Sequence, residues 1–338
     1  MRRWLFWLLI FAFVWLLISH LTEIEKLVQT LQKGRWQWML IAALFQIFSY
    51  VFYACLLWSS YQNVGLQSRV LELLPVTFAA VFANTVAPTG GTAGLALFVH
   101  NAVRRGQSAA RATAGNLLAT VAEFSTFTLI LTVGMVHLFL RHNLKVYEII
   151  AALGLILFTG IQSSALLLGM WRPSLLRRLL NIVYRFVNKV ASRFRRSGLL
   201  AKDWTEKIAT EFTAAASAIG SHRVQLAQTS GFALAMHLAN LSCLYAIFLA
   251  FHNPVKLGIL VSGYAMGFLF LNVSPIPQGI GLVEGVMTLV FTSLGVSSEI
   301  ALVVTLAYRG MTFWLPLLAG FFLLRRATWV DKKDLKSL

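Results

Sequence analysis

Long runs of apolar residues, separated by short polar and basic segments, dominate the sequence. An α-helix needs roughly 20 mainly apolar residues to cross about 30 Å of hydrocarbon. Six stretches meet this requirement: 4–20, 36–60, 110–140, 147–170, 226–251 and 299–324. The pattern therefore predicts an all-α, polytopic bundle of membrane helices. The first stretch follows Arg2 and Arg3 and lacks a small-residue cleavage site, so we expect an uncleaved signal anchor.

Two further apolar stretches, 71–104 and 256–294, are interrupted near their centres by proline and glycine. The first interruption contains Asn84, Pro88, Gly90, Gly91 and Gly94, and the second contains Asn272, Pro275, Pro277, Gly279 and Gly281. Proline and glycine remove or weaken helical hydrogen bonds, and irregular backbone persists at membrane depth only where protein or a wet cavity surrounds it. Each stretch is therefore predicted to form two half-length helices, arranged either as a re-entrant hairpin, which we favour, or as two crossings.

A fixed offset of 189 residues relates the two broken stretches. It aligns Pro88 with Pro277, Gly90 with Gly279, Gly106 with Gly295, Ser108 with Ser297, Ala112 with Ala301 and Leu117 with Leu306. These identities are only modestly above chance, but charge supports them, because Arg104, Arg105 and Arg111 lie at or just after the end of the first stretch and 295–299 has no basic residue. By the positive-inside rule the two hairpins open on opposite sides of the membrane. We therefore predict two inverted repeats, at about 4–140 and 147–324.

The charge distribution predicts topology. The chain is 58% hydrophobic and carries 29 Lys and Arg against 12 Asp and Glu, a net charge of +17. In a soluble protein this excess would suggest nucleic acid, but here the basic residues cluster between the apolar runs, as the positive-inside rule expects. The segment 172–223 has eleven basic residues and three acidic ones. We expect this segment, both termini and the tail 326–338 to lie on the cytoplasmic side of a prokaryotic plasma membrane, with no nucleic-acid partner.

Apolar residues recur at helical spacing within this basic segment. They are Leu176, Leu179, Val183, Val187, Val190 and Phe194. Arginine and lysine fill the intervening positions, a pattern typical of a helix that lies on an anionic leaflet. The alternative is a solvated linker with a stop-transfer role.

Familiar catalytic signatures are absent from the sequence. It contains no H-E-x-x-H, G-x-S-x-G or Walker lysine motif, and its aspartates, Asp203, Asp331 and Asp334, all fall in predicted cytoplasmic segments. Cys55 and Cys243 each sit in an apolar stretch and are expected to be core thiols. We therefore expect no cofactor, no metal site and a transporter-like protein rather than an enzyme.

Three ionisable residues, Glu123, Glu284 and Arg309, stand out within the predicted hydrocarbon. Each costs at least about 2.5–3.5 kcal/mol there when ionised, unless it is paired or hydrated. The offset aligns Arg309 with Thr120, one turn from Glu123, so the two charges could face each other at a lipid headgroup site. An arginine at this depth needs a carboxylate, water or a lipid phosphate within reach, and Glu284 and Glu123 are its candidate carboxylate partners. The alternative is a salt bridge that only fixes helix packing.

Glu284 begins a half-length helix, where the helix dipole alone would also favour a carboxylate. His100 and His237 could relay protons, although a buried, neutral, hydrogen-bonded histidine is the commoner case.

The second motif carries a family resemblance. P-x-G-x-G-x-x-E-G runs from Pro277 to Gly285 and is followed by Gly295, Ala301 and Arg309, while P-T-G-G-T-A-G occurs earlier in the chain. The sequence resembles, over about residues 5–325, the transmembrane-domain family of lysylphosphatidylglycerol synthases and flippases. The resemblance implies lipid translocation. The C-terminal aminoacyltransferase domain of the best-known relatives has no counterpart here, so their aminoacyl-transfer activity is not expected.

These observations leave three hypotheses for function. The first is a lipid flippase or scramblase whose broken hairpins meet at the membrane midplane around Glu123, Glu284 and Arg309. The second is a membrane-embedded transferase that acts on a lipid carrier, for which Glu123 and His100 are the candidate acid and base groups. The third is a non-catalytic partner subunit of a lipid-modifying enzyme. The expected ligand is an anionic phospholipid or a lipid-linked headgroup, and a homo-oligomer is left open.

Overall fold

The computed structural model describes residues 34–86, 92–193, 204–221, 223–274, 276–317 and 319–320, and every regular element within these ranges is helical. The helices are α3 (Trp36–Asn63), α4 (Val70–Val86), α5 (Thr92–Arg104), α6 (Ala109–Leu140), α7 (Val146–Trp171), α8 (Pro173–Arg193), α9 (Trp204–Ser221), α10 (Arg223–Ala250), α11 (Leu257–Val273), the short turn η1 (Pro277–Gly279), α12 (Leu282–Ser293), α13 (Ser298–Arg309) and the π-helical turn η2 (Gly310–Trp314). The predicted crossing at 4–20 and the tail at 326–338 lie outside the described residues.

Five helical segments are long and apolar enough to cross a membrane, and they match the other five predicted crossings. They are Trp36–Asn63, Ala109–Leu140, Val146–Trp171, Val224–Ala250 and Ser298–Leu317. The outer face of α7 illustrates the pattern, because Ile150, Leu153, Leu157 and Ile161 are all exposed at helical spacing. Such a stripe is typical of a surface that faces lipid.

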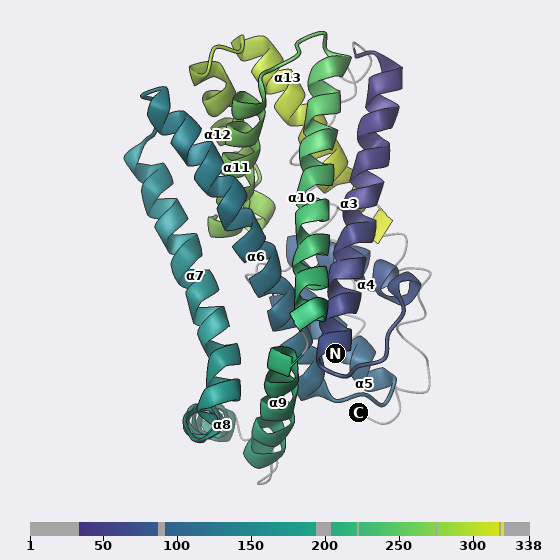
Figure 1. The fold of residues 1–338 in the computed structure, drawn as a ribbon, viewed down its shortest axis with the longest axis vertical. Helices are drawn as coiled ribbons and strands as arrows, with labels where there is room; N and C mark the ends of the chain where they lie inside the picture. Colours follow the sequence, from purple (N-terminus) through teal and green to yellow (C-terminus); the bar gives the residue numbers. More distant parts are fainter. Residues whose placement is uncertain are drawn as a thin grey trace.

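The helices α3 and α10 lie side by side and run in opposite directions (Figure 1). At one end, the backbone N–H of Arg35 donates to the carbonyl of Ala250 at 3.0 Å. At the other end, the hydroxyls of Ser59 and Thr229 lie 2.8 Å apart, and the Asn63 amide donates to Thr229 at 3.2 Å. Polar contacts therefore fix the pair at both ends.

Each helix of this pair leads into one of the broken stretches, and the two stretches begin at opposite ends of the bundle. Each forms two separate short helices, as its proline and glycine pattern predicts: α4 and α5 after α3, and α11 and α12 after α10. In Figure 1, α4 and α5 lie in the lower half and α11 and α12 in the upper half. The two hairpins approach each other, since α4 contacts η1 at the tip of the second hairpin.

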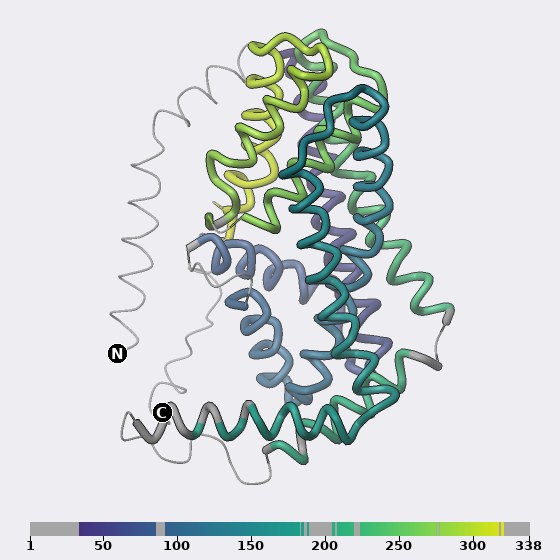
Figure 2. Tube along the Cα trace, turned by 90° about the vertical axis from the view of Figure 1, so that its left-hand side faces the viewer, coloured from purple at the N-terminus to yellow at the C-terminus, as the bar shows by residue number. Residues whose placement is uncertain are grey.

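The helix predicted in the basic segment is confirmed as α8. Figure 1 shows it end-on and Figure 2 shows it lengthwise, running across the end of the bundle rather than along it. This end also holds the loops at 64–69 and 105–108, and we call it the basic end. The helix α9 was not predicted; it packs against α6 and α7 through an apolar face that includes Phe212 and Ala216.

Candidate functional site

Arg309 is the last residue of α13 and is only 3% exposed. Its Nε donates to Oε1 of Glu284 at 2.6 Å, and its Nη2 donates to the backbone carbonyl of Gln278 at 2.8 Å. The guanidinium carbon also lies 4.9 Å from the ring centre of Phe313 in η2. The arginine therefore joins the final span to the tip of the α11–α12 hairpin.

The sequence between η1 and α12 positions these acceptors. Glu284 lies in the first turn of α12, and its Oε2 accepts the backbone N–H of Gly281 at 2.7 Å. Gly279 and Gly281 have φ of +61° and +80°, a region that glycine adopts without strain. A side chain at Gly279 would also approach Val283 to 2.5 Å. The glycines thus allow the tight turn that points a carbonyl and a carboxylate at Arg309.

The ion pair leaves donors of Arg309 unused. A guanidinium carries five N–H donors in a planar fork, and two of them are used by Glu284 and Gln278. The other three have no hydrogen-bond partner within the described residues. Glu284 is itself 13% exposed, so the pair is not sealed from its surroundings. Arg309 therefore keeps hydrogen-bonding capacity beyond its two contacts with Glu284 and Gln278.

Glu123 lies apart from this pair. It occupies α6, and its carboxylate has no hydrogen-bond or ion-pair partner in the part of the chain that the structure describes. The structure pairs Arg309 with Glu284, and the proposed Glu123–Arg309 contact is not formed. The three predicted site residues therefore divide into a bonded pair and a separate acid.

A buried histidine lies beside Glu123. His237 is fully buried, with Nδ1 2.7 Å from the hydroxyl of Tyr264 and Nε2 3.3 Å from the backbone carbonyl of Glu123. A carbonyl only accepts, so Nε2 donates to it, and a neutral ring then accepts from the Tyr264 hydroxyl at Nδ1. The burial and the two hydrogen bonds are those of the buried, hydrogen-bonded histidine that the sequence analysis favoured. His100, in contrast, is exposed on α5.

In the first hairpin, Asn84 connects the two short helices. Its Oδ1 accepts the backbone N–H of Gly94 at 2.7 Å, and a side chain at Gly94 would approach the same amide to 2.6 Å. Asn272, in the second hairpin, is exposed and donates within α11 to Phe268. Pro88, Gly90, Gly91 and Pro275 lie outside the described residues.

Sequence reasoning missed several parts of the site. The carbonyl of Gln278 and the ring of Phe313 were not predicted, and neither was the hydroxyl of Tyr264. A backbone acceptor leaves no side-chain signal. The Tyr264 hydroxyl could have been suspected, because a buried histidine requires polar partners.

Five bilayer-length helices, two broken hairpins and a buried ion pair at a hairpin tip define a multi-pass helical membrane protein. The sequence profile of the family described as the lysylphosphatidylglycerol synthase TM region matches residues 4–320, and the chain belongs to this family. It is also similar to the UPF0104 membrane protein PH1989 of Pyrococcus horikoshii. The two are 22% identical over 305 residues, which cover 88% of this chain and 89% of the relative. The resemblance noted in the sequence is confirmed.

Proposed function

We propose that this protein moves a lipid across the bilayer and that the headgroup passes through the Arg309–Glu284 site. One observation carries the proposal: a nearly buried arginine in a bilayer-length span uses two of its N–H donors on the protein and has three without a partner among the described residues. An intramembrane arginine is expensive unless its charge is compensated. Glu284 compensates the charge here, but three N–H donors are left without an acceptor among the described residues, and a phosphate oxygen would satisfy them.

The arrangement of helices supports the proposal. Helices α3, α4 and α5 have 28, 17 and 13 residues, and α10, α11 and α12 have 28, 17 and 12, in the same order. The leading helices of the two sets are antiparallel, as inverted repeats require. The shorter arm of each hairpin is below the roughly 20 residues needed to cross the hydrocarbon, which favours re-entrant hairpins. Two re-entrant hairpins from opposite leaflets would give a headgroup a polar route.

The family supports the substrate class. Its description names the transmembrane region of lysylphosphatidylglycerol synthase, and phosphatidylglycerol carries an anionic phosphate. An anionic phospholipid is therefore the substrate class that we propose for this chain, and it fits the free N–H donors of Arg309.

The basic end is assigned to the cytoplasm. Arg69, Arg104 and Arg105 lie there with the arginines of α8, and by the positive-inside rule this end stays inside. In a variant whose two native cysteines are replaced by serine, Gln107→Cys at this end should react with a membrane-impermeant maleimide only after cells are opened. Glu299→Cys, at the opposite end, should react in intact cells. The reverse pattern would overturn the assignment.

Lipid movement is tested in proteoliposomes with headgroup-labelled phosphatidylglycerol, followed by the access of an impermeant quencher to the inner leaflet. The Arg309→Lys variant keeps the charge but loses the planar fork, so movement per folded protein should fall about tenfold or more. Arg141→Lys, at an exposed position after α6, is the matched control and should move lipid at the wild-type rate.

Folding is measured on the same samples by size-exclusion chromatography, so that lost activity is separated from lost protein. Arg309→Lys protein that moves lipid as fast as the control would show that the arginine only fixes helix packing. Wild-type vesicles no faster than protein-free vesicles would reject lipid movement itself and favour the transferase and partner-subunit hypotheses.

A further inference from the structure

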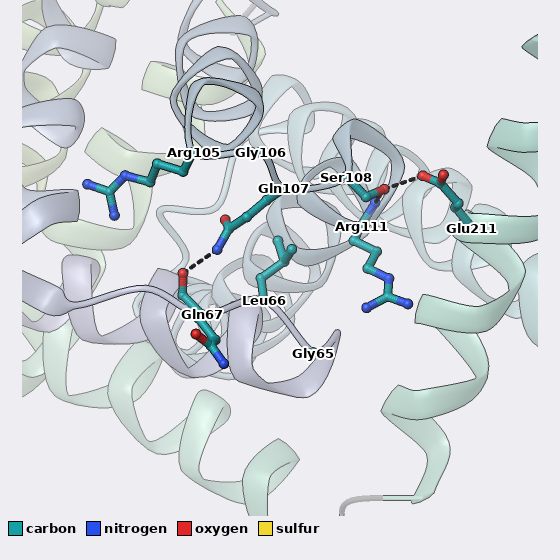
Figure 3. A pocket seen from close by; sticks show the side chains of 9 residues that line it. All are labelled: Gly65, Leu66, Gln67, Arg105, Gly106, Gln107, Ser108, Arg111 and Glu211. Carbon is teal, nitrogen blue, oxygen red and sulfur yellow. Dashed lines mark hydrogen bonds between the residues drawn. The ribbon is translucent and has the colours of Figure 1, made fainter.

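A polar depression of about 460 Å³ lies at the basic end, between the 64–69 loop, the 105–108 loop and α9 (Figure 3). Its lining includes six polar or charged residues: Gln67, Arg105, Gln107, Ser108, Arg111 and Glu211. They come from three separate parts of the chain. The depression is remote in sequence from the Arg309–Glu284 site and shares no residue with it.

Arg111 carries the positive charge in this depression that no ion pair among the described residues neutralises. Arg105 forms an ion pair with Glu72, and its hydrogen bond holds the pKa of the Glu72 carboxyl below its usual range, so both partners stay charged. The Glu211 carboxylate accepts a hydrogen bond from the neutral Ser108 hydroxyl, which holds it at Ser108 but does not neutralise its charge. The guanidinium of Arg111, in contrast, has no partner in the described ranges of the chain. Figure 3 shows it directed away from Glu211.

The walls of the depression are held by hydrogen bonds. The Gln107 amide donates to the backbone carbonyl of Gln67 and so joins the two loops. Ser108 begins α6 and accepts the backbone N–H of Arg111 at 3.2 Å, which fixes the first turn that carries the arginine. The site is therefore formed by positioned backbone rather than by a loose cluster of surface side chains.

Gly65 lies beside Arg111. Its φ of +72° is one that glycine adopts without strain, and a side-chain carbon there would be in van der Waals contact with Nη1 of Arg111 at 3.5 Å. Gly65 follows the end of α3, and Gly106, with a φ of +71°, follows the end of α5. A side-chain carbon at Gly106 would have no atom within 4 Å. Both glycines thus terminate helices without filling the depression between them.

We propose that this depression binds a phosphate group, with Arg111 as its main ligand and Arg105 at its edge. A guanidinium grips two phosphate oxygens through parallel N–H bonds, and the surrounding basic residues of α5 and α8 raise the local concentration of anions. The phosphate has two sources, a soluble phosphate ester or the headgroup of a lipid in the adjoining leaflet. The proposal is independent of lipid movement, because it concerns a second site at the end of the bundle.

The test uses the full chain in a neutral detergent and measures binding of two probes at constant ionic strength. Inorganic phosphate, titrated by calorimetry against chloride, reports a soluble ligand. Phosphatidylglycerol, compared with phosphatidylcholine in mixed micelles and counted by native mass spectrometry, reports a lipid headgroup. Saturable binding of either probe is expected, and the probe that binds identifies the source.

The variants compare two arginines of the same charge and neighbourhood. Arg111→Gln should raise the Kd of the probe about tenfold or more, because the substitution removes a charge-assisted bidentate contact. Arg104→Gln, at the exposed end of α5 and outside the depression, should change it by less than about twofold. Arg111→Lys keeps the charge and should give an intermediate loss. Equal effects at Arg111 and Arg104, or binding of neither probe by the wild-type protein, would overturn the proposal.

Discussion

Two glutamates in the helical core have opposite surroundings. Glu284 stands at a break between helices, where it accepts the N–H of Gly281 and pairs with Arg309. Glu123 stands within the continuous helix α6, and its carboxylate finds no partner among the residues that the structure describes. Their different surroundings follow from the backbone beneath them.

Within a continuous helix the backbone N–H groups are used by the helix itself, so none is left to donate to a carboxylate such as that of Glu123, although a carbonyl can still accept a second bond, as the Glu123 carbonyl does from His237. A broken helix frees such groups, and the turn before α12 uses them to hold a carboxylate through Gly281 and an arginine through the Gln278 carbonyl. Breaks in membrane helices therefore do more than disturb the backbone. They free backbone N–H and carbonyl groups, and hydrogen bonds from these groups stabilise a charged pair at that position.

The largest expected effect comes from removing the arginine. Arg309→Ala leaves Glu284 nearly buried and unpaired, and breaking a buried pair in this way costs about 3–5 kcal/mol. The free energy of unfolding in detergent, measured by denaturant titration, should fall by this amount. Arg141→Ala is the exposed control and should have little effect. If Arg309→Ala and Glu284→Ala were fully additive in a double-mutant cycle, the two side chains would not be energetically coupled.

A smaller effect separates the two acids directly. Glu123→Gln replaces an unpaired carboxylate by a neutral group of the same shape, so the free energy of unfolding should stay within about 1 kcal/mol of wild type or rise. Glu284→Gln, the matched substitution, removes the charge that compensates Arg309 and should cost more. Equal losses at both positions would mean that Glu123 has a partner as important as Arg309.

The sequence predicted those features of the fold that depend on local composition. The five described crossings follow from the length of the apolar runs, and the short helices follow from proline and glycine at 88–94 and 275–281. The helix α8 follows from apolar spacing within the basic segment. The same spacing is present at Ile208, Phe212, Ala215 and Ile219 in α9, so the sequence also carries a signal for that helix.

The contacts of the candidate site were less predictable. The repeat offset placed Arg309 and Glu123 on equivalent helices, but it does not specify the rotation of each helix about its axis. Both acids were candidate partners of Arg309, and of the two it pairs with Glu284. The chain then continues into the π-helical turn η2, where the extra residue changes the direction of the following side chains. Such a turn has no composition signature of its own, and neither does a backbone carbonyl that accepts a hydrogen bond.

The hydrogen bond from Arg309 to residue 278 uses the main chain, and this affects which substitutions the site tolerates. Gln278 has a φ of +54°, so the position selects for residues that adopt left-handed backbone, such as glycine and asparagine, and against β-branched ones. Any residue that meets this conformational requirement presents the same carbonyl. The side chain at 278 can therefore change, within that conformational limit, while the backbone carbonyl that accepts from Arg309 is retained. Replacing Gln278 by alanine would for this reason not reveal the contact.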